Sequence, residues 1–242
     1  MGVNAALAAA ASLVAVAFCL STLDRWLRRR RPHELAWTVS LALFALGSLA
    51  LWWAESAGWG LGSFRVFYLA GAVLNVPWLA LGTVYLLAGE GVGHRVRWWL
   101  VFLSGLTVGI VGFAPTKTGV SGGELPTGKD VFGVAPRVLA AVGSGVAALV
   151  IIVGALWSAW RVARGRNPSL GAQRSVAAPR RLVAGNVLIA VGTLVLSGSG
   201  SLAGRLGKDK AFAVTLLVGI VVLFTGFLVA STRPRAHGGR VS

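Results

Sequence analysis

The stretch VNAALAAAASLVAVAFCLSTL (Val3–Leu23) is an uncharged run that leads directly into DRWLRRRR (Asp24–Arg31). An α-helix rises about 1.5 Å per residue, so about twenty apolar residues match the roughly 30 Å hydrocarbon core of a bilayer. Arginines directly after such a run are typical of a cytosolic helix end. Met1–Asn4 carries no basic residue, so we interpret the run as a retained helix and not as a cleaved signal peptide.

Further runs of this kind follow along the whole chain. Apolar residues make up 56% of the sequence and charged residues 12%, against about 45–50% and about 25% in a soluble domain. The runs are continuously apolar, which favours helices over the alternating strands of a membrane barrel. We predict one all-α domain, residues 1–231, and a short basic cytosolic tail, residues 232–242. The expected spans are Val3–Leu23, Leu35–Ala54, Val66–Ala88, Trp98–Ala114, Val138–Trp157, Leu182–Leu202 and Ala211–Ser231.

The charges between these spans predict the orientation of the bundle. With the N-terminus outside, sixteen of the 23 basic residues fall in cytosolic segments and seven in outer segments. Basic residues are enriched on the cytosolic side, so we expect the C-terminus in the cytosol of a multi-pass protein of the inner (plasma) membrane. The net charge of +16 is explained by this topology, and we expect no nucleic-acid partner.

The third expected span carries the most distinctive residues of the chain. Pro77 lacks an amide hydrogen and clashes with the carbonyl one turn back, which predicts a kink near residues 73–77. The Asn75 amide cannot be satisfied by lipid, so it is expected to face another helix or water. Trp78 and Tyr85 lie on roughly the same face. Either a polar pocket or hinge, or a structural kink with Asn75 bonded to a neighbouring helix, fits this pattern.

The sixth expected span holds the other concentration of intramembrane polar residues. It contains Asn186, Thr193, Ser197 and Ser199. We expect this span to lie beside the third, with Asn75 in reach of its hydroxyl groups, because an unpaired amide in hydrocarbon costs several kcal/mol. Close helix packing is the alternative interpretation of its small residues.

Glycines four residues apart also occur in the fourth span and at the end of the sixth. Gly105 and Gly109 form one such pair, and Gly200 and Gly204 form the other. Small residues at this spacing favour close approach of two helices.

Charged residues near the outer ends of the second and third spans could meet. Glu55 and Arg65 are expected to form an ion pair at an outer mouth, or a surface pair worth at most about 1 kcal/mol. No cluster of His, Cys, Asp or Glu has metal-ligand spacing, and Cys19 is the single cysteine. We expect no metal, no cofactor and no catalytic residue, hence no enzyme.

The segment Arg161–Arg181 contains six arginines and no acidic residue. Such a segment is expected to hold anionic lipid headgroups, at about 1 kcal/mol per basic residue near the surface, or to serve as an orientation signal.

The first ninety residues resemble the seven-helix sensor module at the front of some bacterial histidine kinases. The resemblance rests on Arg28–Arg31, Trp37, Glu55, Tyr68…Pro77-Trp78-Leu79 and Tyr85. After the seventh span only Thr232–Ser242 follows, so a signal would pass to a separate polypeptide. The chain is equally similar to an uncharacterised seven-helix family of high-GC bacteria.

Two functions fit the sequence. The first is a sensor-like module that binds a small ligand or a partner membrane protein, and the second is a transporter or permeation protein for a neutral or hydrophobic solute. An aqueous cavity open to one side and reaching Asn75 would favour transport, and a closed bundle with an apolar groove facing lipid would favour partner binding.

Overall fold

The computed structural model describes residues 2–117, 119–120, 125–164, 179–202 and 208–231. These residues are almost entirely helical, which confirms the expected all-α class, and one isolated bridge joins Thr116 to Phe132. The helices are α1 (Val3–Arg29), α2 (Pro32–Ala57), α3 (Leu61–Phe67), α4 (Asn75–Phe113), α5 (Gly128–Val131), α6 (Val134–Ala163), α7 (Pro179–Leu202) and α8 (Lys208–Ser231), with a π-helix, η1 (Tyr68–Leu74), between α3 and α4.

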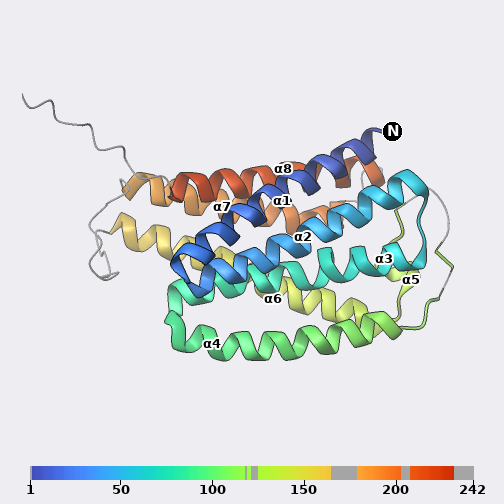
Figure 1. Ribbon diagram of the computed structural model, residues 1–242, viewed down its shortest axis with the longest axis horizontal. Helices are drawn as coiled ribbons and strands as arrows, with labels where there is room; N and C mark the ends of the chain where they lie inside the picture. The colour runs from blue at the N-terminus through green and yellow to red at the C-terminus, as the bar shows by residue number, and fades with distance from the viewer. Residues whose placement is uncertain (1, 118, 121–124, 165–178, 203–207, 232–242) are drawn as a thin grey trace, which may run out of the picture.

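The long element α3–η1–α4 is folded back on itself at Gly89. Gly89 has φ +83° and ψ 174°, outside the helical region. A residue with a side chain rarely adopts this positive φ, so glycine permits the reversal. We call residues 75–88 the first arm of α4 and residues 90–113 the second arm. Figure 1 shows the two arms side by side, joined by this elbow.

The turn between α1 and α2 is equally short and has clear local causes. Arg30 takes a left-handed conformation with φ 52°, and its N–H donates to the carbonyl of Trp26, which ends α1. Pro32 then starts α2, where its missing N–H removes no helical hydrogen bond. The chain therefore reverses direction at this turn, and α1 and α2 form an antiparallel pair.

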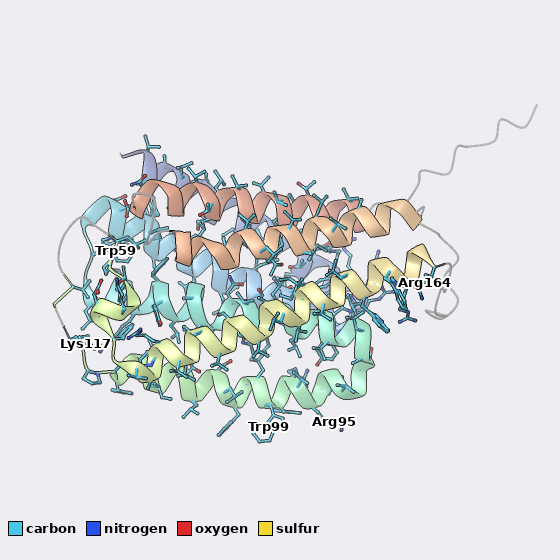
Figure 2. The ribbon with its side chains drawn as sticks, turned by 180° about the vertical axis from the view of Figure 1, so that it is seen from behind. Trp59, Arg95, Trp99, Lys117 and Arg164 are labelled. Atoms are coloured by element: carbon cyan, nitrogen blue, oxygen red, sulfur yellow. The ribbon has the colours of Figure 1, made fainter. Side chains whose placement is uncertain are left out.

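The long helices lie roughly side by side and alternate in direction (Figure 1). α2 lies between α1 on one side and η1 with α4 on the other, α6 packs on α4, and α7 and α8 form a pair that contacts α6 and α1. Figure 2 shows Trp59 and Lys117 at one end of the bundle and Arg164 at the other. We call these the Trp59 end and the Arg164 end.

Glycines set the closest helix contacts. A Cβ on Gly47 of α2 would lie 3.0 Å from the backbone nitrogen of Gly71 in η1. A Cβ on Gly192 of α7 would lie 2.6 Å from the backbone nitrogen of Leu223 in α8. A Cβ on Gly105 or Gly109 would meet nothing within 4 Å. The expectation that this pair packs against a helix is therefore wrong among the described residues, and Gly204 lies outside them.

Within the described residues, four helices are long and apolar enough to cross a membrane. They are Val3–Arg29, Pro32–Ala57, Leu61–Phe113 and Val134–Ser158. Large apolar side chains cover their outward faces, including Leu13, Phe102 and Val146. Shorter apolar stretches occur at Val187–Leu196 and Ala213–Gly226. The protein is thus a helical protein with the characteristics of a membrane-embedded chain.

Candidate functional site

The Asn75 side chain is buried between α2 and α4, near the middle of the bundle. It is only 7% exposed. The Ser40 hydroxyl of α2 faces both the main-chain carbonyl and the side-chain Oδ1 of Asn75, at 3.0 and 2.9 Å. A hydroxyl carries one hydrogen, so it donates to one of these two oxygens at a time. Asn75 is therefore held by a neighbouring helix, which is the second of the two interpretations of its pattern.

The kink expected near residues 73–77 stays a prediction, and a π-helix, η1, ends at Leu74 just before Pro77. Within η1 the N–H of Asn75 donates to the carbonyl of Ala70, five residues back. Pro77, which has no amide hydrogen, lies in the first turn of α4, just after η1. The Ser144 hydroxyl of α6 donates to the carbonyl of Ala72 inside η1. A side chain from another helix thus contacts the backbone of η1.

Trp78 and Tyr85 both contact the second arm of α4. The indole N–H of Trp78 donates to the Ser104 hydroxyl at 3.2 Å, and Ser104 in turn donates to the carbonyl of Leu100 at 2.7 Å. Tyr85 stacks edge-on against the ring of His94, with centroids 5.4 Å apart. The Tyr85 hydroxyl is buried and has no hydrogen-bond partner. These two aromatic residues therefore attach the second arm to the first.

The partner of Asn75 is not the one that we expected. α2 and α6 are the helices that flank η1 and the first arm, whereas α7 packs mainly on α8 and α6. Thr193 of α7 donates to the carbonyl of Ile189 in its own helix, at 2.8 Å. The side chains of Asn186, Ser197 and Ser199 lie outside the described residues. The structure shows a junction of α2, η1 and α6, and the expected contact of Asn75 with the polar side chains of the sixth span stays a prediction.

Arg65 finds a backbone partner across the bundle. Its Nη2 donates to the carbonyl of Ala114, just after α4, at 2.7 Å, and its Nε is buried without a partner. Glu55 lies in the last turn of α2. The expected ion pair between these residues stays a prediction.

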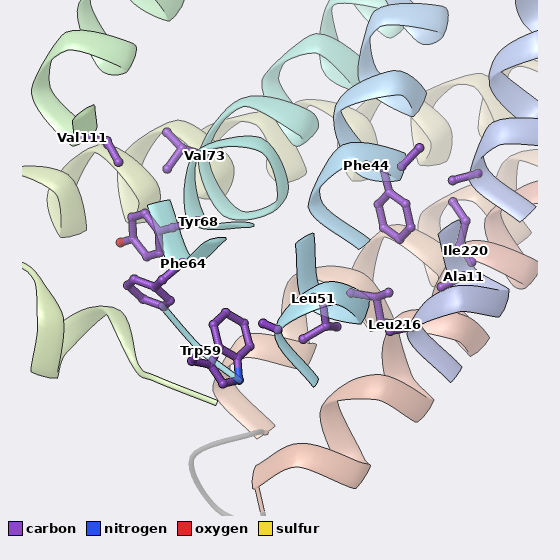
Figure 3. Close-up of a cluster of buried hydrophobic side chains, with 14 of the residues drawn as sticks. Ala11, Phe44, Leu51, Trp59, Phe64, Tyr68, Val73, Val111, Leu216 and Ile220 are labelled. Carbon is purple, nitrogen blue, oxygen red and sulfur yellow. The ribbon is translucent and has the colours of Figure 1, made fainter. Parts of the chain in front are cut away.

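An aromatic cluster at the Trp59 end was not foreseen from the sequence. Phe64 lies at its centre, with ring centroids 6.0 Å from Trp59, 5.8 Å from Tyr68 and 5.5 Å from Phe132. The Tyr68 hydroxyl approaches the carbonyl of Pro136 at 3.4 Å. Figure 3 labels three of these rings, Trp59, Phe64 and Tyr68, and shows Trp59 near Leu51 of α2. We call Trp59, Phe64, Phe67, Tyr68 and Phe132 the Trp59 cluster.

The sequence contains part of the information needed to predict this cluster. Phe64, Phe67 and Tyr68 recur at the spacing of one helical face. Phe132 comes from a segment far along the chain, and its position depends on the bridge with Thr116. The helical face was therefore predictable, and its partner was not.

Arginine side chains stack on tryptophan rings at the Arg164 end. Arg30 lies 4.9 Å above the ring of Trp26, and Arg164 lies 4.1 Å above that of Trp160. In the second arm, Arg97 lies 5.5 Å from the ring of Trp98. Such pairs combine an apolar ring with a charged group, which suits the boundary between hydrocarbon and headgroups.

Comparison with known proteins gives no relative from which a function could be inferred. No protein-family model, curated protein or solved structure matches the chain. Among the described residues, no three His, Cys, Asp or Glu side chains are grouped as a metal site would require. The site is thus defined by its own contacts, namely Ser40–Asn75, Ser144–Ala72 and Trp78–Ser104.

Proposed function

We propose that the chain crosses the inner (plasma) membrane seven times, with the N-terminus outside and the C-terminus in the cytosol. The stretch Leu61–Phe113 contains 53 residues. As one straight helix it would be about 80 Å long, more than twice the roughly 30 Å hydrocarbon core. The elbow at Gly89 divides it into two segments of suitable length. α7 and α8 have 24 residues each, long enough for one crossing apiece.

The charges at the two ends support this orientation. Among the side chains that the structure describes, nine arginines lie at or near the Arg164 end, and four basic residues lie at the Trp59 end. The first group is Arg25, Arg28, Arg29, Arg30, Arg31, Arg95, Arg97, Arg161 and Arg164, and the second is Arg65, Lys117, Lys129 and Arg137. Because basic residues are enriched on the cytosolic side of membrane proteins, this distribution supports a cytosolic position for the Arg164 end.

Cysteine labelling in intact cells tests the topology. In a Cys19→Ala background, a membrane-impermeant reagent is expected to label Lys129→Cys at once and Gly91→Cys only after the cells are opened. Both positions are exposed, so accessibility reports the side of the membrane. Labelling of Gly91→Cys in intact cells would contradict the elbow being cytosolic.

We propose further that the protein is a non-catalytic, sensor-like module that binds a ligand or a partner membrane protein. The observation that carries this proposal is the closed polar junction around Asn75. Ser40 is 1% exposed and Asn75 is 7% exposed, and they are bonded to each other. A path for a solute would need polar groups that face water in this position. The closed junction therefore favours binding over transport.

The cytosolic arginines suggest anionic lipid headgroups as a second kind of partner. The stacked pairs Arg30–Trp26, Arg97–Trp98 and Arg164–Trp160 occur on three different helices. A guanidinium that lies on an indole keeps its N–H edge free for a phosphate group. These pairs fit phospholipids that carry a net negative charge.

The alternative, a transporter, makes the opposite prediction for chemical accessibility. In the Cys19→Ala background, Ser40→Cys is expected to stay unlabelled by a small impermeant thiosulfonate from either side of the membrane. Gly91→Cys in the same protein supplies the positive control, because position 91 is exposed. Rapid one-sided labelling at position 40 would favour transport and overturn the binding proposal.

A further inference from the structure

We propose that the elbow at Gly89 binds one phospholipid of the cytosolic leaflet whose headgroup carries a primary amine, phosphatidylethanolamine. The lipid phosphate would bind Tyr85 and Arg97, and the ammonium group would bind Glu90. This inference deepens the lipid binding proposed for Arg97 and rests on the proposed cytosolic position of the elbow. The contacts that carry it lie within the two arms of α4.

The Tyr85 hydroxyl is a buried polar group without a partner in the protein. The Tyr85 residue is 5% exposed, and its hydroxyl oxygen has no hydrogen-bond partner. Buried tyrosine hydroxyls usually have a partner, because burial removes the hydrogen bonds that they make with water. A ligand that bonds this hydroxyl would therefore gain affinity without breaking a contact of the fold.

The second arm places an arginine beside this tyrosine. A Cβ on Gly93 would lie 2.2 Å from Cδ1 of Tyr85, so only a glycine lets the ring lie on the backbone of the second arm. Leu100, two turns further along, packs in the same apolar cluster as Tyr85. Arg97 lies on the same helix face, one turn after Gly93 and one turn before Leu100, and is half-buried. The Arg97 charge is therefore within electrostatic range of the Tyr85 hydroxyl.

The charges near the hydroxyl have opposite signs. The Glu90 carboxylate is also within electrostatic range of Tyr85. Among the residues that the structure describes, neither Glu90 nor Arg97 belongs to an ion pair. The Arg97 guanidinium lies 5.5 Å from the ring of Trp98 and can bind a phosphate through its N–H groups. An anion alone would be repelled by Glu90, whereas a headgroup with a phosphate and an ammonium group matches both charges.

The surroundings of the elbow fit a lipid better than a soluble ligand. Arg97 is half-buried and Glu90 is exposed, so a headgroup would reach the hydroxyl by moving side chains that already face water. Leu86 of the first arm is 47% exposed and Val96 of the second arm is 37% exposed. Apolar surface for the acyl chains therefore continues from the elbow along both arms.

Native mass spectrometry of the delipidated, full-length protein tests the amine part of the site. Phosphatidylethanolamine and phosphatidylcholine with the same acyl chains differ only in the three methyl groups on the headgroup nitrogen. We expect the parent to bind one phosphatidylethanolamine about fivefold more tightly than phosphatidylcholine, because only the former can donate to Glu90. Glu90→Gln is expected to lose this preference. Equal binding of the two lipids by the parent would overturn the proposal.

Two variants and a matched control test the phosphate part. Tyr85→Phe and Arg97→Gln are each expected to weaken the binding of both lipids about fivefold. Tyr85→Phe keeps the melting temperature of the parent, because the hydroxyl has no partner in the protein. Arg95→Gln is the control, since Arg95 is exposed and its Nε donates to the carbonyl of Gly91 in its own helix. Unchanged binding in Tyr85→Phe, or equal losses in Arg95→Gln and Arg97→Gln, would overturn the site.

Inorganic phosphate distinguishes a lipid from a free anion. A large excess of inorganic phosphate is expected to leave the bound phosphatidylethanolamine in place, because phosphate lacks the amine and the acyl chains. Displacement of the lipid would identify a site for free anions and overturn the proposal. Labelling of Gly91→Cys in intact cells would refute the proposed topology, whereas the lipid preference of the purified protein would stand independently of that result.

Discussion

Polar groups in the middle of the bundle have hydrogen-bond partners on other helices, whereas several buried polar groups at its two ends have none. In the middle, Ser40, Asn75 and Ser144 are bonded to partners on other helices. At the ends, several buried polar atoms have no partner, including the Glu34 carboxylate Oε2, the Trp59 indole nitrogen and the Tyr85 hydroxyl. Water and headgroups reach the ends of a membrane protein but not its centre. The contrast indicates that the central contacts are structural and that the ends are the places where binding partners can add hydrogen bonds.

The largest loss of stability is expected from a substitution where two backbones touch, at Gly47 of α2 and Gly71 of η1. Gly47→Val would push a side chain against the backbone of Gly71. We expect a loss of about 2–3 kcal/mol in the free energy of unfolding, measured by denaturant titration in detergent. Gly105→Val, which adds the same atoms where nothing lies within 4 Å, is expected to change it by less than about 0.5 kcal/mol. Equal losses of stability in the two variants would show that the backbone contact at Gly47 matters no more than the open space around Gly105.

Loss of the hydrogen bond between Ser40 and Asn75 is expected to lower the free energy of unfolding by less than the Gly47 substitution does. Asn75→Leu removes the side-chain acceptor but leaves the main-chain carbonyl for Ser40. The same titration is expected to show a loss of about 1 kcal/mol, typical of side-chain hydrogen bonds between membrane helices. A double-mutant cycle with Ser40→Ala isolates the pair. An interaction energy of zero would mean that the bond contributes nothing to stability.

At the Arg164 end the expected effect concerns binding and not folding. Arg164→Gln removes the charge stacked on Trp160. We expect retention of anionic over zwitterionic phospholipid to fall by up to about 1 kcal/mol, measured by native mass spectrometry at fixed lipid composition. Lys129→Gln, an exposed charge near the Trp59 end, is the control and is expected to have no effect on this preference. Equal losses in both variants would indicate nonspecific attraction.

The two tyrosines provide the smallest and sharpest test. Tyr85→Phe removes a hydroxyl that has no partner, so the free energy of unfolding is expected to change by less than about 0.5 kcal/mol. Tyr68→Phe removes the hydroxyl that approaches Pro136 and is expected to cost about 0.5–1 kcal/mol. A larger loss for Tyr85→Phe than for Tyr68→Phe would show that the Tyr85 hydroxyl is bonded in the membrane.

Local features of the sequence predicted much of this structure. Apolar runs of membrane length predicted where helices lie. Burial of Asn75 followed from the cost of an unpaired amide in hydrocarbon. Each of these features depends on residues that are close together in the chain.

Features that depend on distant residues were not predictable in the same way. Many serines lie on helix faces, and nothing local distinguishes Ser40 or Ser144 from the serines of α7 as partners for η1. The sequence alone did not single out Ser40 as the partner of Asn75, because helix adjacency is set by packing across the bundle.

The elbow at Gly89 also bears on how the chain is synthesised. A single non-helical residue joins the two arms, so both leave the ribosome within a few seconds of each other. Asn75 and Pro77 make the first arm a poor candidate for entering lipid alone, whereas the second arm offers the apolar stretch from Trp98 to Val111. The two arms therefore suit insertion as one helical hairpin, in which the later segment assists the earlier one.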